Sequence, residues 1–167
     1  MTTPHRTLLL VLAPVLALLA GPAATLEGQT MDENCRKDVT ALHQFFEDWF
    51  SGKLEPSEKN FQRFTATVAE SFEIISPDGT RMVREQITER VKNAHGANKG
   101  SGFRVWIKNY RGRPIQNGIH LATYEEWQEL DGKERGRLST AVFRSKPDAP
   151  NGVVWLHVHE TWLPSDQ

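Results

Sequence analysis

The spacing of apolar residues changes near Phe103, and this change constrains the fold more than any other feature of the sequence. Before Phe103, apolar side chains recur every three or four residues, as at Val39, Leu42 and Phe46, which is the period of an amphipathic helix. After it, Val105 and its successors alternate with charged residues, which is the period of a strand. Helices followed by long antiparallel strands predict an α+β domain in which the helices cover one face of the sheet.

The individual elements can be placed from their start and stop residues. We expect Asp32 to cap a first helix that ends at Ser51-Gly52, and a second helix to begin at Pro56-Ser57-Glu58. The further elements are a short strand at 72–75, a turn at 76–79, a third helix carrying Val83, Ile87 and Val91, and strands at about 103–108, 119–130, 137–145 and 153–163, with a hairpin turn at Asp131-Gly132.

The first residues have the composition of a secretory signal peptide. His5 and Arg6 are followed by an apolar run of 13 residues from Leu8 to Ala20 and then by small residues up to Ala24. The run is shorter than the roughly 20 residues that span a bilayer. We therefore expect a secreted or periplasmic protein with a signal peptide at 1–24, a linker at 25–31, a folded domain at 32–163 and a tail at 164–167.

Charge and cysteine content exclude several classes of partner and an internal disulfide. Lys and Arg number 20 and Asp and Glu number 21, so neither a nucleic acid nor, after signal cleavage, a membrane is an expected partner. Cys35 is the single cysteine and cannot form an internal disulfide. We expect it to be buried and inert, with a bridge to a second chain as the alternative.

Three stretches resemble the nuclear-transport-factor-2-like superfamily, and most closely its SnoaL-like and calcium/calmodulin-dependent kinase association-domain-like branch. They are 72–79, 122–128 and 155–160. The last is similar to a terminal strand in which His-Glu-His follows a tryptophan, with Thr161 in place of the second histidine. The resemblance implies a cone-shaped, curved antiparallel sheet wrapped on N-terminal helices, a cystatin-like fold, and a homodimer that packs sheet against sheet. It does not select an activity, because one fold supports many functions.

The Asp131-Gly132 turn predicts a register for the two strands that it joins. A two-residue turn places Glu126 opposite Arg137 and Tyr124 opposite Ser139, whereas a looser turn shifts the pairs by one residue. If this polar face lies inside, a carboxylate held by arginine near a histidine suits general acid–base chemistry. The alternative is an ion pair facing solvent or a second subunit, worth ~0.2–1 kcal/mol.

The opposite face of these strands supports a second interpretation. Because helices must cover the apolar side of a sheet, the family resemblance favours this face as the inner one. A glutamate buried there without a partner has a raised pKa and is a candidate acid or base. The pocket then consists of Trp127, Val142, Leu156, Val158 and Trp162, with Glu125 and Glu160 as its polar groups.

Strict alternation along the last strand separates its histidines from Glu160. His157 and His159 lie on one face and Glu160 on the other. The two histidines have the spacing of strand-borne metal ligands, but only His120 offers a third ligand. We expect no metal and no cofactor, and we expect His43 on the surface of its helix.

Three functions remain open, in a definite order. The preferred one is an exported domain that binds a small apolar molecule in an apolar pocket and forms a homodimer through its sheet. The second is an enzyme of the lyase or isomerase type, with Glu125, Glu126 and His159 as candidate catalytic residues. The third is a dimerisation module without catalysis. The candidate pocket residues are Tyr124, Trp127, Arg137, Ser139, His157, Glu160 and Trp162.

Overall fold

The computed structural model describes residues 23–116 and 118–164. The predicted signal peptide, apart from its last two residues, lies outside this part of the chain. Among the described helices, none is long and apolar enough to cross a membrane.

Three helices precede the long strands. They are α1 (Ala23–Phe50), α2 (Glu58–Thr65) and α3 (Arg84–Asn93). α1 starts before the cap that was predicted at Asp32, so residues 25–31, expected as a linker, are helical. α2 begins where predicted, because the Ser57 side chain accepts a hydrogen bond from the backbone N–H of Asn60 at 3.2 Å.

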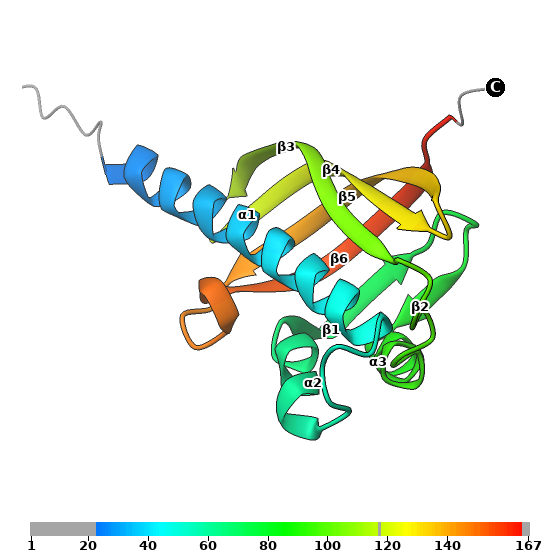
Figure 1. Ribbon diagram of the computed structural model, residues 1–167. Coiled ribbons are helices and arrows are strands. Elements are labelled where there is room, and N and C mark those ends of the chain that lie inside the picture. The colour runs from blue at the N-terminus through cyan, green and yellow to red at the C-terminus, as the bar shows by residue number, and fades with distance from the viewer. Residues whose placement is uncertain (1–22, 117, 165–167) are drawn as a thin grey trace, which may run out of the picture.

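Six strands form one open sheet in the order β2-β1-β6-β5-β4-β3 (Figure 1). β1 and β6 run parallel and the other neighbours run antiparallel, so the sheet is mixed, and the expectation of a purely antiparallel sheet is wrong. The α+β class with a curved sheet packed on N-terminal helices is confirmed. The strands are β1 (Val68–Ile75), β2 (Arg81–Val83), β3 (Arg104–Gln116), β4 (Ile119–Leu130), β5 (Lys133–Ser145) and β6 (Val153–Trp162). A short 3-10 turn, η1 (Pro150–Gly152), directly precedes β6.

The tight hairpin register between β4 and β5 is confirmed. Asp131 and Gly132 have φ of 51° and 73°, as a two-residue turn of mirror-image type requires. Glu126 therefore pairs with Arg137, and the polar residues of both strands lie on one face.

A bulge in β6 breaks the strict alternation that was predicted for the last strand. Trp155 pairs with Phe143, but the next paired residue is His157, opposite Val142, so Leu156 is an extra residue. Because of this extra residue, the side chains after Leu156 point to the faces opposite to those that strict alternation predicts. As a result Trp155 and Val158, which alternation would separate, are both buried in the core together with Glu160.

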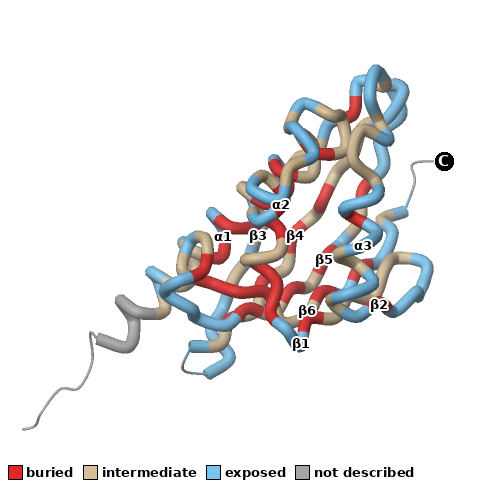
Figure 2. The backbone as a smooth tube through the Cα atoms, turned by 90° about the horizontal axis from the view of Figure 1, so that it is seen from below, coloured by how far each residue is buried: buried red, intermediate tan, exposed pale blue. Residues whose placement is uncertain are grey.

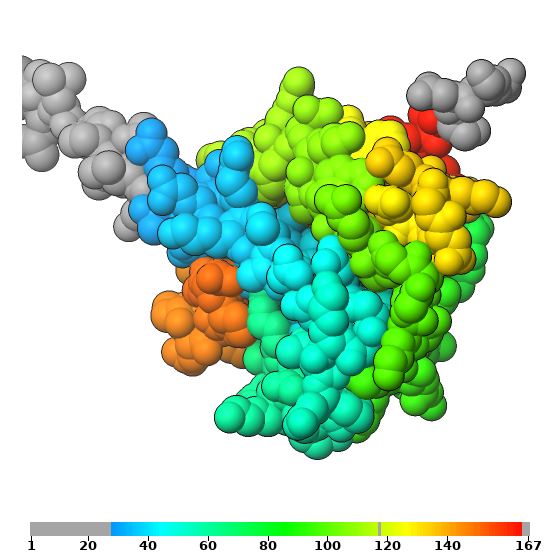
Figure 3. Space-filling model, in the orientation of Figure 1, coloured from blue at the N-terminus to red at the C-terminus, as the bar shows by residue number. Residues whose placement is uncertain are grey.

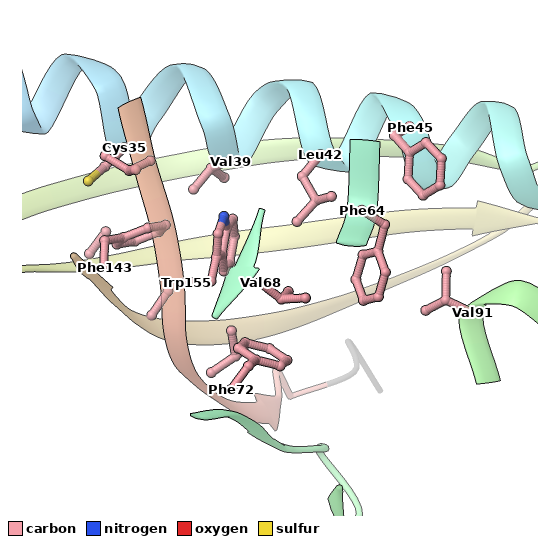
Figure 4. Packing of buried hydrophobic residues seen from close by; sticks show 14 of the residues in the cluster. Cys35, Val39, Leu42, Phe45, Phe64, Val68, Phe72, Val91, Phe143 and Trp155 are labelled. Carbon is pink, nitrogen blue, oxygen red and sulfur yellow. The ribbon is translucent and has the colours of Figure 1, made fainter. Parts of the chain in front are cut away.

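The core lies between α1 and the inner face of the sheet, which is the face that α1 crosses (Figure 1). The space-filling view shows α1 running across the surface on this side of the molecule (Figure 3). Figure 2 shows buried segments along α1 and the central strands, with exposed turns at the sheet's ends. In the close-up, Val39, Leu42 and Phe45 of α1 point towards Trp155 and Phe64 (Figure 4). Each such buried side chain contributes about 1.5–3 kcal/mol, so this layer supplies the main stabilisation of α1.

Cys35 belongs to the same core and is fully buried. Burial, reinforced by the nearby carboxylates of Asp32 and Asp38, raises the pKa of the Cys35 thiol to about 12. The predicted burial of Cys35 is confirmed, and its inertness stays a prediction that the burial of the thiol supports.

Gly112 of β3 leaves room for a partly buried contact between His120 of β4 and Asp32 of α1. A Cβ at this position would lie 1.7 Å from Oδ1 of Asp32 and 2.6 Å from Nε2 of His120. His120 Nε2 lies 2.8 Å from the Asp32 carboxylate. His120, considered above as a third metal ligand, thus contacts α1 and is not a neighbour of His157 or His159.

Asp38 of α1 is completely buried, and its carboxylate joins four segments of the chain. Both carboxylate oxygens accept two hydrogen bonds each, so the buried charge is fully satisfied. The donors are Arg63 of α2 at 2.8 Å, Thr67 before β1 at 3.0 Å, Asn151 of η1 at 2.9 Å and Trp155 of β6 at 2.5 Å.

Replacing Asp38 by Asn is expected to lower the free energy of unfolding by about 2–4 kcal/mol, because an amide N–H₂ would face two of these donors. Urea unfolding followed by circular dichroism measures the change. Asp148→Asn, at an exposed residue, is the matched control and should stay within ~0.5 kcal/mol of the unmodified chain. Equal effects of the two changes would contradict the role given to Asp38.

Candidate functional site

The inner face of the sheet and the helices enclose a cavity of about 250 Å³, called the inner cavity below. Its walls are largely apolar and include Phe46, Phe50, Phe64, Phe72 and Ile87. Charged and polar groups gather on the strand side. They are His43, Tyr124, Glu126, Gln128, Arg137 and Glu160.

Glu126 is the most tightly held group of the cavity. It is 2% exposed, and one carboxylate oxygen accepts from Gln128 at 2.7 Å and from Arg137 Nη2 at 2.5 Å. The other oxygen lies 2.9 Å from His43 Nε2. Burial opposes ionisation, but the positive charges of Arg137 and His43 outweigh it and hold the pKa of Glu126 well below its usual range.

His43 is a site residue that sequence reasoning missed, since it was expected on the helix surface. It is 4% exposed, and its Nδ1–H donates to the Val39 carbonyl at 2.6 Å, which turns Nε2 towards Glu126. The missed signal was its spacing: His43 lies four residues after Val39 and three before Phe46, on the apolar stripe of α1.

Glu160 is buried but loosely held. Ser139 Oγ donates to it at 3.5 Å, and Arg137 Nε lies 3.2 Å from the same oxygen in an orientation that makes no hydrogen bond. Burial raises the pKa of Glu160 to about 7, with the charge of Arg137 opposing the rise and that of Glu126 adding to it. One arginine therefore lies between two carboxyl groups whose pKa values move in opposite directions, an arrangement suited to proton transfer near neutral pH.

The inner face is the polar one, so the preference for the opposite face was wrong. Of the expected apolar wall only Val158 lines the cavity, and the other apolar lining residues come from the three helices and from β1, β2 and β6. The structure brings together Tyr124, Glu126, Arg137, Ser139 and Glu160 of the predicted site residues.

Glu125 and Trp127 lie on the other side of the sheet, called the outer face below. The Trp127 indole N–H donates to Glu125 at 2.9 Å, and Asn109 donates to the same carboxylate at 2.7 Å. These two hydrogen bonds lower the pKa of Glu125. Glu125 therefore has no contact with the inner cavity.

The remaining predicted site residues do not line the cavity. His159 is exposed, on the outer face, and His157 Nδ1 lies 3.8 Å from Glu73. Trp162 is 40% exposed, with the Arg135 guanidinium 3.4 Å from its ring centre. His159 therefore cannot act with Glu126. Over the described residues, no three His, Cys, Asp or Glu side chains converge as metal ligands.

The ionisation of Glu160 predicts a pH-dependent stability. Between about pH 4.5 and 7 the folded chain holds a proton that the unfolded chain has released, so the free energy of unfolding falls as pH rises through this window. Glu160→Gln removes the effect, and its stability relative to the unmodified chain should rise by about 2–3 kcal/mol from pH 4.5 to 8. Urea unfolding at several pH values measures the difference.

Glu125→Gln is the control for this experiment, because the lowered pKa of Glu125 places its titration below the window. The difference in free energy of unfolding between Glu125→Gln and the unmodified chain should be constant above pH 5. Parallel curves for Glu160→Gln and the unmodified chain would refute the assignment of Glu160 as the proton-holding group.

Comparison with known proteins identifies relatives over most of the described chain. The family model described as sucrose-6-phosphate phosphohydrolase C-terminal matches residues 35–164. Sucrose-phosphatase 1 of Nicotiana tabacum is 29% identical over 128 residues, which cover 75% of this chain and 30% of that protein. Probable sucrose-phosphatase 2 of Arabidopsis thaliana is 30% identical over 138 residues, which cover 82% of this chain and 32% of that protein. The chain thus spans about three tenths of the length of these relatives.

Solved structures with a similar fold have lower sequence identity. A nuclear-transport-factor-2-like protein of unknown function from Pseudomonas aeruginosa has a TM-score of 0.69 at 21% identity, covering 78% of this chain and 99% of that one. The CaMKII hub of S. rosetta has a TM-score of 0.59 at 12% identity, covering 87% and 100%. These likenesses concern the fold, and they confirm the nuclear-transport-factor-2-like architecture expected from the sequence.

The relatives overturn the expected function, an exported domain that binds a small apolar molecule. The matched proteins are sucrose-phosphatases, and the match extends across the helices and the whole sheet. The inner cavity also carries ionised groups where an apolar wall was expected. The chain belongs to the sucrose-6-phosphate phosphohydrolase C-terminal family.

Proposed function

We propose that this chain is an association domain in sucrose 6-phosphate hydrolysis, which joins two copies of itself through the outer face of its sheet and does not cleave the phosphate ester. The family match supports a place beside such a phosphatase. Most of the length of each plant relative lies outside the match, so the matched part acts as an accessory to the rest.

The observation that carries the proposal is the composition of the outer face. α1 packs on the inner face (Figure 1), while the outer side of β3 to β6 presents large side chains that none of the described helices covers. Trp106 pairs with Trp127 across β3 and β4, and the Lys108 ammonium lies 4.5 Å from the Trp127 ring centre. Tryptophan is enriched in the buried centres of protein interfaces.

Leu138 lies next to these aromatic residues and is 42% exposed. Its register partners are Glu125 on β4 and Thr161 on β6, so the leucine sits within a mixed apolar and charged surface. Lys108 pairs with the same Glu125. A surface carrying both charges and half-buried aromatic rings suits a twofold contact, in which each residue of one copy meets the same surface of the other.

The association can be tested with two exposed leucines of β4 and β5. Sedimentation of the full chain should give twice the mass of one chain, and Leu138→Glu should give monomers, because a carboxylate would be buried in the contact. Leu130→Glu is the matched control: Leu130 is 40% exposed but lies at the hairpin end, outside the proposed contact. Its dimer should persist.

Two results would refute the proposal. The first is a monomeric unmodified chain at tens of micromolar. The second is release of inorganic phosphate from sucrose 6-phosphate by this chain alone, which would make it a hydrolase and not an accessory domain. Circular dichroism of each variant distinguishes loss of association from loss of folding.

A further inference from the structure

A second cavity, separate from the inner cavity, lies where α2 ends and α3 begins. It has a volume of about 390 Å³, within the range of about 300–1,000 Å³ that small-molecule sites occupy. Three basic side chains from two distant parts of the sequence line it, and we call it the basic pocket. They are Arg84 of α3, Arg144 of β5 and Lys146 of the following loop.

Arg84 is held in place with part of its guanidinium unused. Nη2 donates to the Thr65 carbonyl at 3.3 Å, while Nε is buried without a hydrogen-bond partner. A buried N–H normally has an acceptor, and its absence calls for an explanation. Because protein atoms cover Nε, an anion in the basic pocket would supply the acceptor once the Arg84 side chain turned its guanidinium towards the pocket.

The charge of the basic pocket is strongly unbalanced. Over the described residues, none of its three cations forms an ion pair with a carboxylate. Glu70 is the one acidic residue in the lining, so three positive charges face one negative charge. The remaining two positive charges match the dianion that a phosphate monoester carries at neutral pH.

Hydroxyl groups and an irregular strand complete the lining. Thr65 and Ser71 both line the pocket and have hydroxyl groups that can donate to oxygen. In β1, the register with β6 jumps from Val68 to Glu73, so the strand bulges where it borders the pocket. The pocket therefore borders the irregular part of β1, with Val154 of β6 between this part and Arg144 of β5.

We propose that the basic pocket binds a phosphate group, either as free phosphate or as the phosphate of a sugar monoester. Arg84 and Arg144 are the principal ligands, because guanidinium matches two phosphate oxygens at once. Lys146 adds charge, and Glu70 weakens the binding of dianions and favours release. The site is independent of association through the outer face, so either proposal can fail without the other.

Calorimetric titration of the full chain with inorganic phosphate, sucrose 6-phosphate and sucrose tests the site at constant ionic strength. Both phosphates should bind and sucrose should not. Arg84→Gln and Arg144→Gln should each weaken phosphate binding by about tenfold or more. Arg113→Gln, which removes an exposed charge from β3 at the far edge of the sheet, should leave it unchanged.

Glu70→Gln supplies a test that structural damage cannot imitate, because it should strengthen binding of both phosphates. The monomeric Leu138→Glu chain should bind phosphate as the unmodified chain does. The proposal is overturned if neither phosphate binds, or if the three arginine variants weaken binding equally, which would indicate general charge attraction. Tighter binding of the ester than of free phosphate would support contact of the sugar with the pocket.

Discussion

The buried carboxylate of Asp38 determines how the helical layer sits on the sheet. An ionised group without water must have all of its hydrogen bonds supplied by the protein, and here the donors come from α2, the start of β1, η1 and β6. These partners fix the depth of α1 and also its rotation about its own axis. His43, on the next turn, therefore faces the sheet at Glu126, so the geometry of the inner cavity follows from Asp38.

Trp155 connects the two buried polar clusters. Its indole N–H donates to Asp38, while its ring lies 6.5 Å, between ring centres, from both His43 and Tyr124. The Trp155 side chain thus contacts the Asp38 cluster through its N–H and lies close to the Glu126 cluster through its ring. Buried charges of this kind add little net stability compared with apolar packing, but they penalise every arrangement that leaves a partner unpaired. The outcome is one orientation of α1 where apolar packing alone would tolerate several.

Much of the architecture follows from local features of the sequence. The change in apolar spacing predicts the order of elements, and the Asp131-Gly132 turn predicts the β4–β5 register, which places Glu126 beside Arg137 and Tyr124 beside Ser139. The parallel pairing of β1 with β6 has no local signal, because the two strands are distant in sequence. The bulge at Leu156 also has no local signal in the sequence. It accompanies the burial of both Trp155 and Glu160 in one core.

The prediction of which face of the sheet lies inside was wrong, and the reason is physical. Apolar residues on one side of a strand do not by themselves show which side helices cover, since aromatic residues on α1 and α2 can supply the apolar surface from above. His43 was the decisive residue. Its position on the apolar stripe of α1 implies a buried polar partner on the sheet, and Glu126 is the carboxylate that the β4–β5 register leaves facing it.

The pairing of the first strand with the last has a consequence for how this chain reaches its native state. Asp38 and Trp155 are 117 residues apart, and Asn151 is 113 residues from the same carboxylate. Until β6 is present, β1 lacks its central neighbour and Asp38 lacks two of its donors, whereas the β3–β4–β5 hairpins pair strands that follow one another directly in the sequence. Native structures dominated by such distant contacts form slowly. During synthesis the hairpins can therefore form early, but the helical layer can dock only after the last strand has left the ribosome.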